Sequence, residues 1–180
     1  MIPASWRRVN AALAVVLALL VLALVVVLVL GNKVLPWTTA SEQHTRQYDA
    51  VEQAASRAVL AFLNVDYRRM DAQIKQVESL STGEFRTQYS GAAPQFKAAA
   101  QQAKAVTVGA VRYTAVNAVS GSRAVVLVAA NTVVKNSSTT KQKSTSACPH
   151  TGARCDKYRF VVTLDRAGSG WKMSKLAGVS

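Results

Sequence analysis

Histidine and cysteine, which supply many catalytic bases, nucleophiles and metal ligands, are scarce in this sequence. The 180 residues include two histidines, His44 and His150, and two cysteines, Cys148 and Cys155. The sequence contains no G-x-S-x-G, H-E-x-x-H or P-loop motif, and neither histidine belongs to a recognisable nucleophile–base pattern. We therefore expect a protein that is not an enzyme and that needs no cofactor.

Acidic residues are also few, and their scarcity is concentrated in one half of the chain. The sequence has 22 Lys and Arg against nine Asp and Glu, a formal net charge of +13. Between residues 41 and 103 the two signs balance, whereas from Lys104 onward the only acidic residues are Asp156 and Asp165. We expect this basic half to attract anionic lipid, an anionic envelope polymer or an acidic protein. The alternative is a solvated basic surface without a specific partner.

One long hydrophobic run stands out near the N-terminus, because residues 11–30 are all Ala, Val or Leu. An α-helix rises about 1.5 Å per residue, so the run matches the hydrocarbon core of a bilayer, which is about 30 Å thick. Arg7 and Arg8 precede the run, whereas Lys33 alone follows it closely. This asymmetry predicts a transmembrane helix whose N-terminus lies in the cytoplasm.

Trp6 and Trp37 lie on either side of the run, as aromatic residues do at membrane interfaces. The alternative is a cleaved signal peptide, but the run is longer than the apolar part of such peptides, and the small-residue cleavage site at 38–40 is distant from it. We therefore predict a single-pass protein of the cell membrane, and we expect no nucleic-acid partner for a domain outside the cytoplasm. The predicted segments are a cytoplasmic N-terminus at 1–10, a transmembrane helix at 11–30, a juxtamembrane linker at 31–44 and an extracytoplasmic domain at 45–180.

Both cysteines fall in the predicted extracytoplasmic domain. Cys148 and Cys155 lie in a segment rich in Ser, Thr and Lys. In an oxidising compartment this close spacing predicts a disulfide that closes a small loop. The alternative is a metal site completed by His150, but it would have three ligands and lacks the paired C-x-x-C spacing of zinc sites. We therefore expect a disulfide and no metal.

The first part of the domain has helical periodicity in three stretches. The second stretch follows Asp66 and ends at Ser81-Thr82-Gly83. The third begins near Gly83, and Gly91 and Pro94 are expected to divide it into two pieces. The first stretch carries an apolar stripe at steps of three and four residues, formed by Tyr48, Val51, Ala55, Ala58, Val59, Phe62 and Leu63.

From Lys104 onward the composition and alternation are those of β-strands. The seven apolar residues at 124–130 are typical of a central strand that is covered on both faces. Helices followed by antiparallel strands predict an α+β domain. We expect a roll of the SnoaL/ketosteroid-isomerase-like type, with three helical pieces packed on a curved sheet of about four strands. The expected strands are 106–119, 124–135, 157–165 and 171–176, with a polar excursion at 136–156.

Three segments resemble those of a known family. They are Asn64–Asp71 (NVDYRRMD), Ser81–Arg86 (STGEFR) with Tyr89, and Gly170–Leu176 (GWKMSKL). Together they resemble the Mce-associated membrane proteins of actinobacteria, over most of residues 45–180. The resemblance implies a single-pass anchor, an extracytoplasmic α+β roll and association with Mce-type importers of lipids or sterols. The excursion at 136–156 is longer than the family leads us to expect, which favours a partner surface specific to this chain.

We expect this excursion and its flanks to contact the anionic partner, through Lys135, Lys141, Lys143, Arg154, Lys157 and Arg159. Asp66 and Tyr67 form the one candidate pair for isomerase-like chemistry, but the structural interpretation, with Asp66 as the cap of the second helix and Tyr67 as a packing residue, explains them better. We favour an accessory or scaffold protein of an Mce-type system. A lipid- or small-ligand-binding domain is the main alternative, followed by an isomerase-like enzyme.

Overall fold

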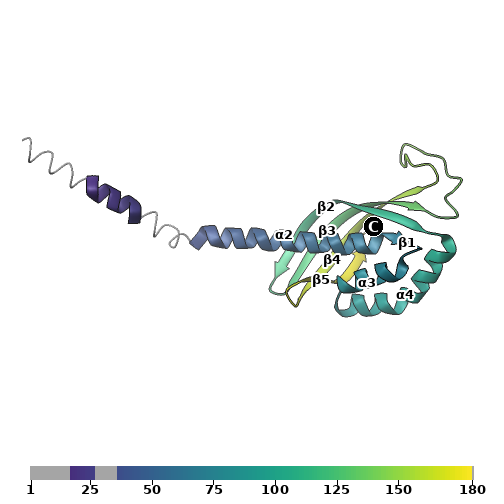
Figure 1. Cartoon of the computed structure of the whole chain (residues 1–180), viewed down its shortest axis with the longest axis horizontal. Coiled ribbons are helices and arrows are strands. Elements are labelled where there is room, and N and C mark those ends of the chain that lie inside the picture. The colour runs from purple at the N-terminus through teal and green to yellow at the C-terminus, as the bar shows by residue number, and fades with distance from the viewer. Residues whose placement is uncertain (1–16, 27–35, 180) are drawn as a thin grey trace, which may run out of the picture. The chain divides into compact units, whose positions relative to one another are not determined.

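The computed structural model describes residues 17–26 and 36–179. The chain divides into two compact units, residues 1–45 and 46–180. The helices precede the main strands along the chain, as predicted for an α+β domain (Figure 1). The elements are α2 (Pro36–Leu63), β1 (Val65–Asp66), α3 (Met70–Ser79), α4 (Gly83–Ala103), β2 (Val106–Ser120), β3 (Arg123–Lys135), β4 (Arg154–Ala167) and β5 (Gly170–Gly178).

Residues 17–26, the described part of the apolar run, are helical, and all their side chains are exposed. Within the two described ranges, no helix is long and apolar enough to span a bilayer. The remainder of the predicted span, 11–16 and 27–30, lies outside the described residues, so the transmembrane helix stays a prediction. The same holds for the cytoplasmic segment and for the predicted interface residues Trp6, Arg7, Arg8 and Lys33.

Helix α2 begins at Pro36, so residues 36–44 of the predicted linker are helical, and Trp37 lies in the first turn. Proline is well suited to this position because its fixed φ matches the helix and its missing N–H would have no intrahelical partner there.

The sheet is a five-stranded antiparallel meander in which each strand pairs with its neighbours in sequence. The predicted turn at Gly121-Ser122 joins β2 to β3, and Gly121 has a φ of +56°, which an L-residue with a side chain adopts at a cost. The predicted turn near residues 167–170 joins β4 to β5. The fifth strand, β1, was not predicted, because two residues are too few to show alternation.

Strand β3 lies in the middle of the sheet, but its covering differs from the prediction. Side chains alternate between the two faces of a strand. The residues that face α2 are almost fully buried, whereas Leu127 on the opposite face is 44% exposed. The prediction that both faces are covered is therefore wrong, because helices pack on one face and the other, although apolar, is open. We call this second face the outer face.

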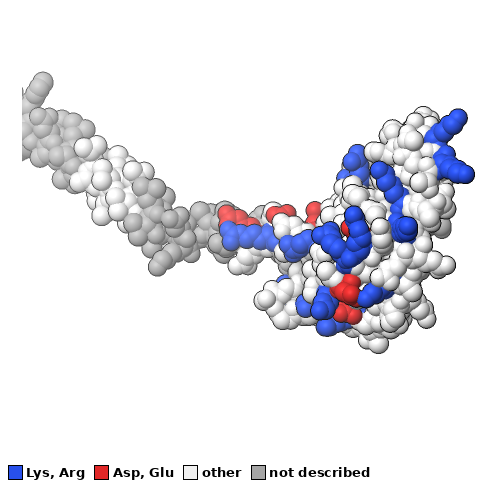
Figure 2. All heavy atoms as spheres, turned by 45° about the vertical axis from the view of Figure 1, so that its right-hand side comes forward, with Lys and Arg blue, Asp and Glu red and all other residues white. Residues whose placement is uncertain are grey.

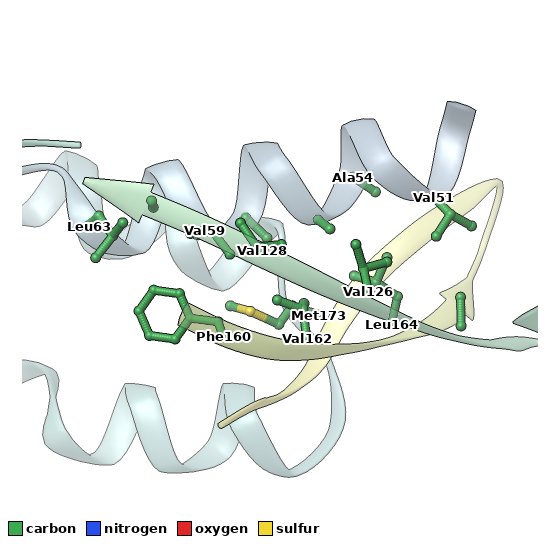
Figure 3. Packing of buried hydrophobic residues seen from close by; sticks show 14 residues of the cluster. Val51, Ala54, Val59, Leu63, Val126, Val128, Phe160, Val162, Leu164 and Met173 are labelled. Carbon is green, nitrogen blue, oxygen red and sulfur yellow. The ribbon is translucent and has the colours of Figure 1, made fainter. Parts of the chain in front are cut away.

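The core lies between α2 and the inner face of β3, β4 and β5 (Figure 3). The predicted apolar stripe of α2 is buried in this core at Val51, Val59 and Leu63, but Tyr48 at the start of the stripe is 42% exposed. The core also includes the buried side chain of Met173 from β5. The buried cluster comprises Val51, Ala54, Ala55, Ala58, Val59, Leu63, Ala124, Val126, Val128, Ala130, Phe160, Val162, Leu164 and Met173.

The end of α2 is fixed against β2 by a close contact that requires glycine. A Cβ atom built on Gly109 would lie 2.9 Å from the Cβ of Leu63, which is closer than packed carbon atoms come. The backbone N–H of Gly109 donates a 2.8 Å hydrogen bond to the side-chain oxygen of Asn64. The absence of a side chain at this position therefore sets how closely α2 approaches the sheet.

Helix α4 is continuous through Gly91 and Pro94, so the predicted division into two pieces is wrong. Proline removes one N–H and leaves the carbonyl one turn earlier without its helical partner. Pro94 is exposed, so water can satisfy that carbonyl. Ala93 and Ala100 are buried on the same side of α4 and hold the helix on both sides of the proline.

Most of the predicted excursion at 136–156 is a loop that projects beyond the end of the sheet, but its last three residues belong to β4, which begins at Arg154 and not at 157 as predicted (Figure 1). Cys148 and Cys155 are joined in a disulfide, as predicted, and the alternative metal site is wrong because both sulfurs are in this bond. Thr139 is buried at the base of the loop. Its hydroxyl accepts a hydrogen bond from the N–H of Asn136 at 2.9 Å and donates one to the carbonyl of Gly152 at 3.0 Å.

Two buried threonines offer a matched test of this packing. Thr132 is 2% exposed and its hydroxyl has no hydrogen-bond partner, whereas Thr139 is 1% exposed and bonded on both sides. We expect Thr132→Val to leave the free energy of unfolding unchanged or raise it by up to about 1 kcal/mol. Thr139→Val should lower it by about 1–3 kcal/mol. Urea unfolding followed by circular dichroism measures both, and a greater loss for Thr132→Val would contradict the assignment.

Removal of the disulfide should destabilise the domain. For a loop of this length the chain-entropy estimate is about 2.5 kcal/mol, so Cys148→Ser with Cys155→Ser should lower the free energy of unfolding by about this amount. The wild-type protein under reducing conditions is the control and should match the double variant. Two titratable thiols in the non-reduced wild-type protein would refute the expectation. So would equal stability of the non-reduced wild type and the double variant.

Candidate functional site

The register of the sheet divides the six predicted contact residues into three groups, all of them exposed. Lys141 and Lys143 lie in the projecting loop. Arg154 points to the same face as its neighbour Asp156 and forms a 3.0 Å ion pair with it. The remaining three lie on the outer face, because each is paired with an outer-face residue of the adjacent strand: Lys135 with Val106, Lys157 with Asn131 and Arg159 with Ala129.

The outer face carries three further basic residues that the sequence analysis did not single out. Lys172 and Lys175 lie on β5 opposite Asp165 and Thr163, and Arg123 lies at the start of β3. Arg123 donates a 2.9 Å hydrogen bond to Asp165 and lowers the pKa of that carboxyl group. The alternation of the strands at 157–165 and 171–176 could have placed Lys172 and Lys175 on this face, had the register between the two strands been known.

An apolar groove crosses the middle of the outer face. It has a volume of about 230 Å³ and spans β2, β3 and β4. Tyr113, which is 78% exposed, and Leu127 line it together with the small side chains of Ala115 and Ala129, and Arg159 lies at its margin. Charged and apolar groups therefore meet on this face, where no helix of the described residues covers them. Figure 2 shows that Lys and Arg also reach the surface elsewhere on the domain, including the projecting loop.

Asp66 lies in β1 and is held by arginines from the turn that follows. The Nε and Nη2 atoms of Arg68 donate hydrogen bonds of 2.8 and 2.9 Å to its two carboxylate oxygens, and Arg69 lies 3.7 Å away. The hydrogen bonds from Arg68 lower the pKa of Asp66 from 3.8 to about 2. The interpretation of Asp66 as the cap of the second helix is wrong, because α3 begins at Met70 after Arg69 and has no side-chain cap.

A polar cavity of about 350 Å³ adjoins this ion pair. Asp66, Arg69, Gln73 and Gln76 contribute to its lining. The side-chain oxygen of Gln73 already accepts a 2.8 Å hydrogen bond from the N–H of Asp66. Tyr67 contributes nothing to the lining, and its ring instead lies under the guanidinium of Arg68, whose Cζ is 5.7 Å from the ring centroid. The structure thus does not bring Asp66 and Tyr67 together in one cavity.

An aromatic cluster that was not predicted from the sequence lies on the helical side of the domain. Phe62 of α2 makes edge-to-face contacts with Phe85 and Tyr89 of α4, which stack on each other at 5.9 Å, and Tyr89 stacks on Phe96. An apolar cavity of about 370 Å³ lies beside the cluster, with Met70 in its wall. Burial raises the pKa of Tyr89. The aromatic residues at 85, 89 and 96 were visible as apolar points in the sequence, but their pairing with Phe62 was not.

The two histidines lie in different elements of the chain. His44 is exposed on α2 and His150 is exposed in the projecting loop. Among the residues that the structure describes, no group of three or more His, Cys, Asp or Glu side chains is placed to hold a metal ion.

The Asp66–Arg68 ion pair predicts a specific dependence of stability on pH. The pKa of Asp66 is lower in the folded chain than its ordinary value of 3.8, so ionisation stabilises the folded state above that pH. This contribution should be lost as the pH falls from about 4 to about 2. In a double-mutant cycle of Asp66→Asn and Arg68→Gln, followed by thermal unfolding, the coupling present at pH 7 should fade over that range. A coupling that is unchanged at pH 2 would contradict the assignment.

Solved structures with the same fold have very different sequences. An IcmL-like type IV secretion system protein of Legionella pneumophila superposes with a TM-score of 0.56 at 14% identity, over 72% of this chain and 89% of that one. A periplasmic fragment of TraM gives 0.54 at 10% identity, over 72% and 95%. CagV of Helicobacter pylori, a VirB8 homologue, gives 0.54 at 12% identity, over 73% and 97%. The fold is therefore that of VirB8-type periplasmic domains.

One curated relative has a similar sequence. The protein Rv1363c of Mycobacterium tuberculosis is 32% identical over 178 residues, which cover 96% of this chain. This chain spans 64% of the length of that relative. The family described as "Uncharacterized protein Rv1363c/MT1408-like" matches residues 10–180, nearly the whole sequence. The chain belongs to the Rv1363c/MT1408-like family.

Proposed function

We propose that this chain is a non-enzymatic accessory protein, anchored in the cell membrane, that presents its folded domain outside the cytoplasm to an Mce-type lipid or sterol import system. The observation that carries the proposal is the contrast between the two faces of the sheet. The inner face is filled by apolar side chains, whereas exposed apolar and basic groups gather on the outer face. Such an arrangement suits a domain that binds a partner on its surface.

The N-terminal segment supports membrane anchoring. Every residue from 17 to 26 is apolar and exposed, and the apolar run continues on both sides in the sequence. A surface of this kind is stable where it is surrounded by other apolar groups, as in a bilayer. The basic pair Arg7 and Arg8 favours a cytoplasmic N-terminus. Solved structures of the same fold include a type IV secretion system protein and a periplasmic fragment of TraM, which agrees with a position in the cell envelope.

The link to Mce-type transport rests on the three segments that resemble the Mce-associated proteins. Two of them meet in the fold: Ser81 lies beside Met173 of β5, and the N–H of Thr82 donates a 2.9 Å hydrogen bond to the carbonyl of Met173. The third segment contains β1 and the Asp66–Arg68 ion pair. These positions support an architecture shared with the Mce-associated proteins. The outer face is where a partner specific to this chain would bind.

The environment of Asp66 favours a non-enzymatic role. A carboxylate acts as a general base when its pKa lies near the working pH. Arg68 lowers the pKa of Asp66 to about 2, so at neutral pH this carboxylate is a weak base that is already hydrogen-bonded. Its ion pair instead stabilises the turn between β1 and α3.

Affinity purification of the full chain from native membranes in mild detergent tests the proposal. We expect Mce-type transporter subunits to be recovered at low ionic strength and lost near 0.5 M salt, because attraction between exposed charges is screened within a few ångströms at that concentration. Mass spectrometry of proteins and lipids provides the readout. Purification without any envelope transport protein would contradict the accessory role.

The apolar cavity beside the aromatic cluster favours a second candidate, a lipid- or small-ligand-binding domain. Phe62, Met70 and Phe96 line this cavity, which opens between helices. A defined lipid that co-purifies without a protein partner would support this candidate over the first. Replacement of Ala99, an exposed residue of the same lining, by Phe should then fill the cavity and reduce the bound lipid.

A further inference from the structure

The outer face of the sheet has one dominant sign of charge. Its basic side chains outnumber its acidic ones, and the two acidic residues that the register places there, Asp66 and Asp165, are already paired with Arg68 and Arg123. Arg159 has no acidic partner among the described residues, although it lies beside the apolar groove. The basic residues of the face are Arg123, Lys135, Lys157, Arg159, Lys172 and Lys175.

The shape of the groove restricts its occupant. Its lining combines the small side chains of Ala115 and Ala129 with the larger ones of Tyr113 and Leu127, so the surface is hollowed there. A depression accepts a projecting side chain, whereas insertion into a bilayer requires side chains that project from the protein. The groove is open and crosses three strands, so it leaves much of a small molecule exposed, whereas small-ligand sites enclose most of the ligand.

The charge of the face also argues against a second copy of the same chain. In a symmetric pair each outer face would meet an identical surface. The basic residues of one copy would then oppose those of the other, and the two acidic residues of each, Asp66 and Asp165, are occupied by Arg68 and Arg123. Like charges brought together at an interface cost several kcal/mol. Charge complementarity therefore requires a different and acidic partner.

We propose that the outer face is the docking surface for an acidic segment of a partner protein, in which an aliphatic side chain enters the groove between Tyr113 and Leu127 and a nearby carboxylate pairs with Arg159. This inference rests on the proposed accessory function and specifies its binding surface. Tyrosine and arginine are the residue types that most often dominate binding energy at protein interfaces. The surrounding lysines accelerate the encounter with an acidic partner by long-range attraction.

Site-specific photo-crosslinking in the full chain tests the proposal. Tyr113 is replaced by p-benzoylphenylalanine, which has a similar shape, and the cells are irradiated before the membranes are solubilised. We expect an adduct with a protein whose cross-linked peptide contains an aliphatic residue with Asp or Glu close by. The same replacement at Tyr48, an exposed tyrosine of α2, is the control and should not give this adduct.

Charge variants in the Tyr113-labelled chain separate a specific contact from general attraction. Arg159→Glu should reduce the adduct by about tenfold or more, since it opposes the partner's carboxylate with a like charge. Arg86→Glu, an exposed site on α4, makes the same change in net charge and should reduce it far less. Adducts with lipid alone, with a second copy of the chain or with a peptide lacking acidic residues would overturn the proposal. So would an adduct that is insensitive to Arg159→Glu.

The two tests fail independently. Recovery of transporter subunits by affinity purification, combined with no protein adduct at Tyr113, would overturn the docking surface and leave the accessory function standing. An acidic peptide cross-linked at Tyr113 from a protein unrelated to transport would support the docking surface and overturn the accessory function.

Discussion

The packing of one helical stripe against one face of the sheet is the constraint on which the rest of this domain depends. Val51, Val59 and Leu63 of α2 are buried against the strands, and Gly109 permits the close approach at the end of the helix. Because α2 and α4 pack on the inner face of the sheet, the outer face of the same strands keeps its apolar side chains in contact with solvent. The stability of the fold and the availability of its outer face therefore have the same origin.

The elements with strong local signals could be predicted from the sequence. The stripe of α2, the hairpin turn at Gly121 and the alternation of β4 all follow from the chemistry of neighbouring residues. The short strand β1 could not be predicted, because its pairing with Val106 and Thr107 comes from the tertiary fold. The continuity of α4 through Pro94 likewise depends on the exposure of the proline, which a sequence pattern does not contain.

The composition of the candidate site could be predicted from the sequence, but the placement of its residues on one face of the sheet could not. The basic character of the second half was plain from composition, but the distribution of those charges between two faces depends on register. Arg154 and Arg159 lie five residues apart on the same strand and therefore point to opposite faces, one to an ion pair and the other to the groove. The cysteine pair was the exception, since its close spacing favoured the disulfide over the alternative metal site, and the disulfide is what the structure shows.

The order of the elements along the chain has a consequence for biosynthesis. Strands β2 to β5 are joined in sequence, and the hairpins formed by short turns can close within microseconds, soon after their residues are available. Helix α2 precedes them all, yet its stripe is covered by residues of β3, β4 and β5 that lie at least 60 positions later. The first core element to leave the ribosome therefore waits for partners that are synthesised much later. Until β3, β4 and β5 are all complete, at least part of that stripe remains an uncovered apolar surface that the nascent chain must keep from other hydrophobic surfaces.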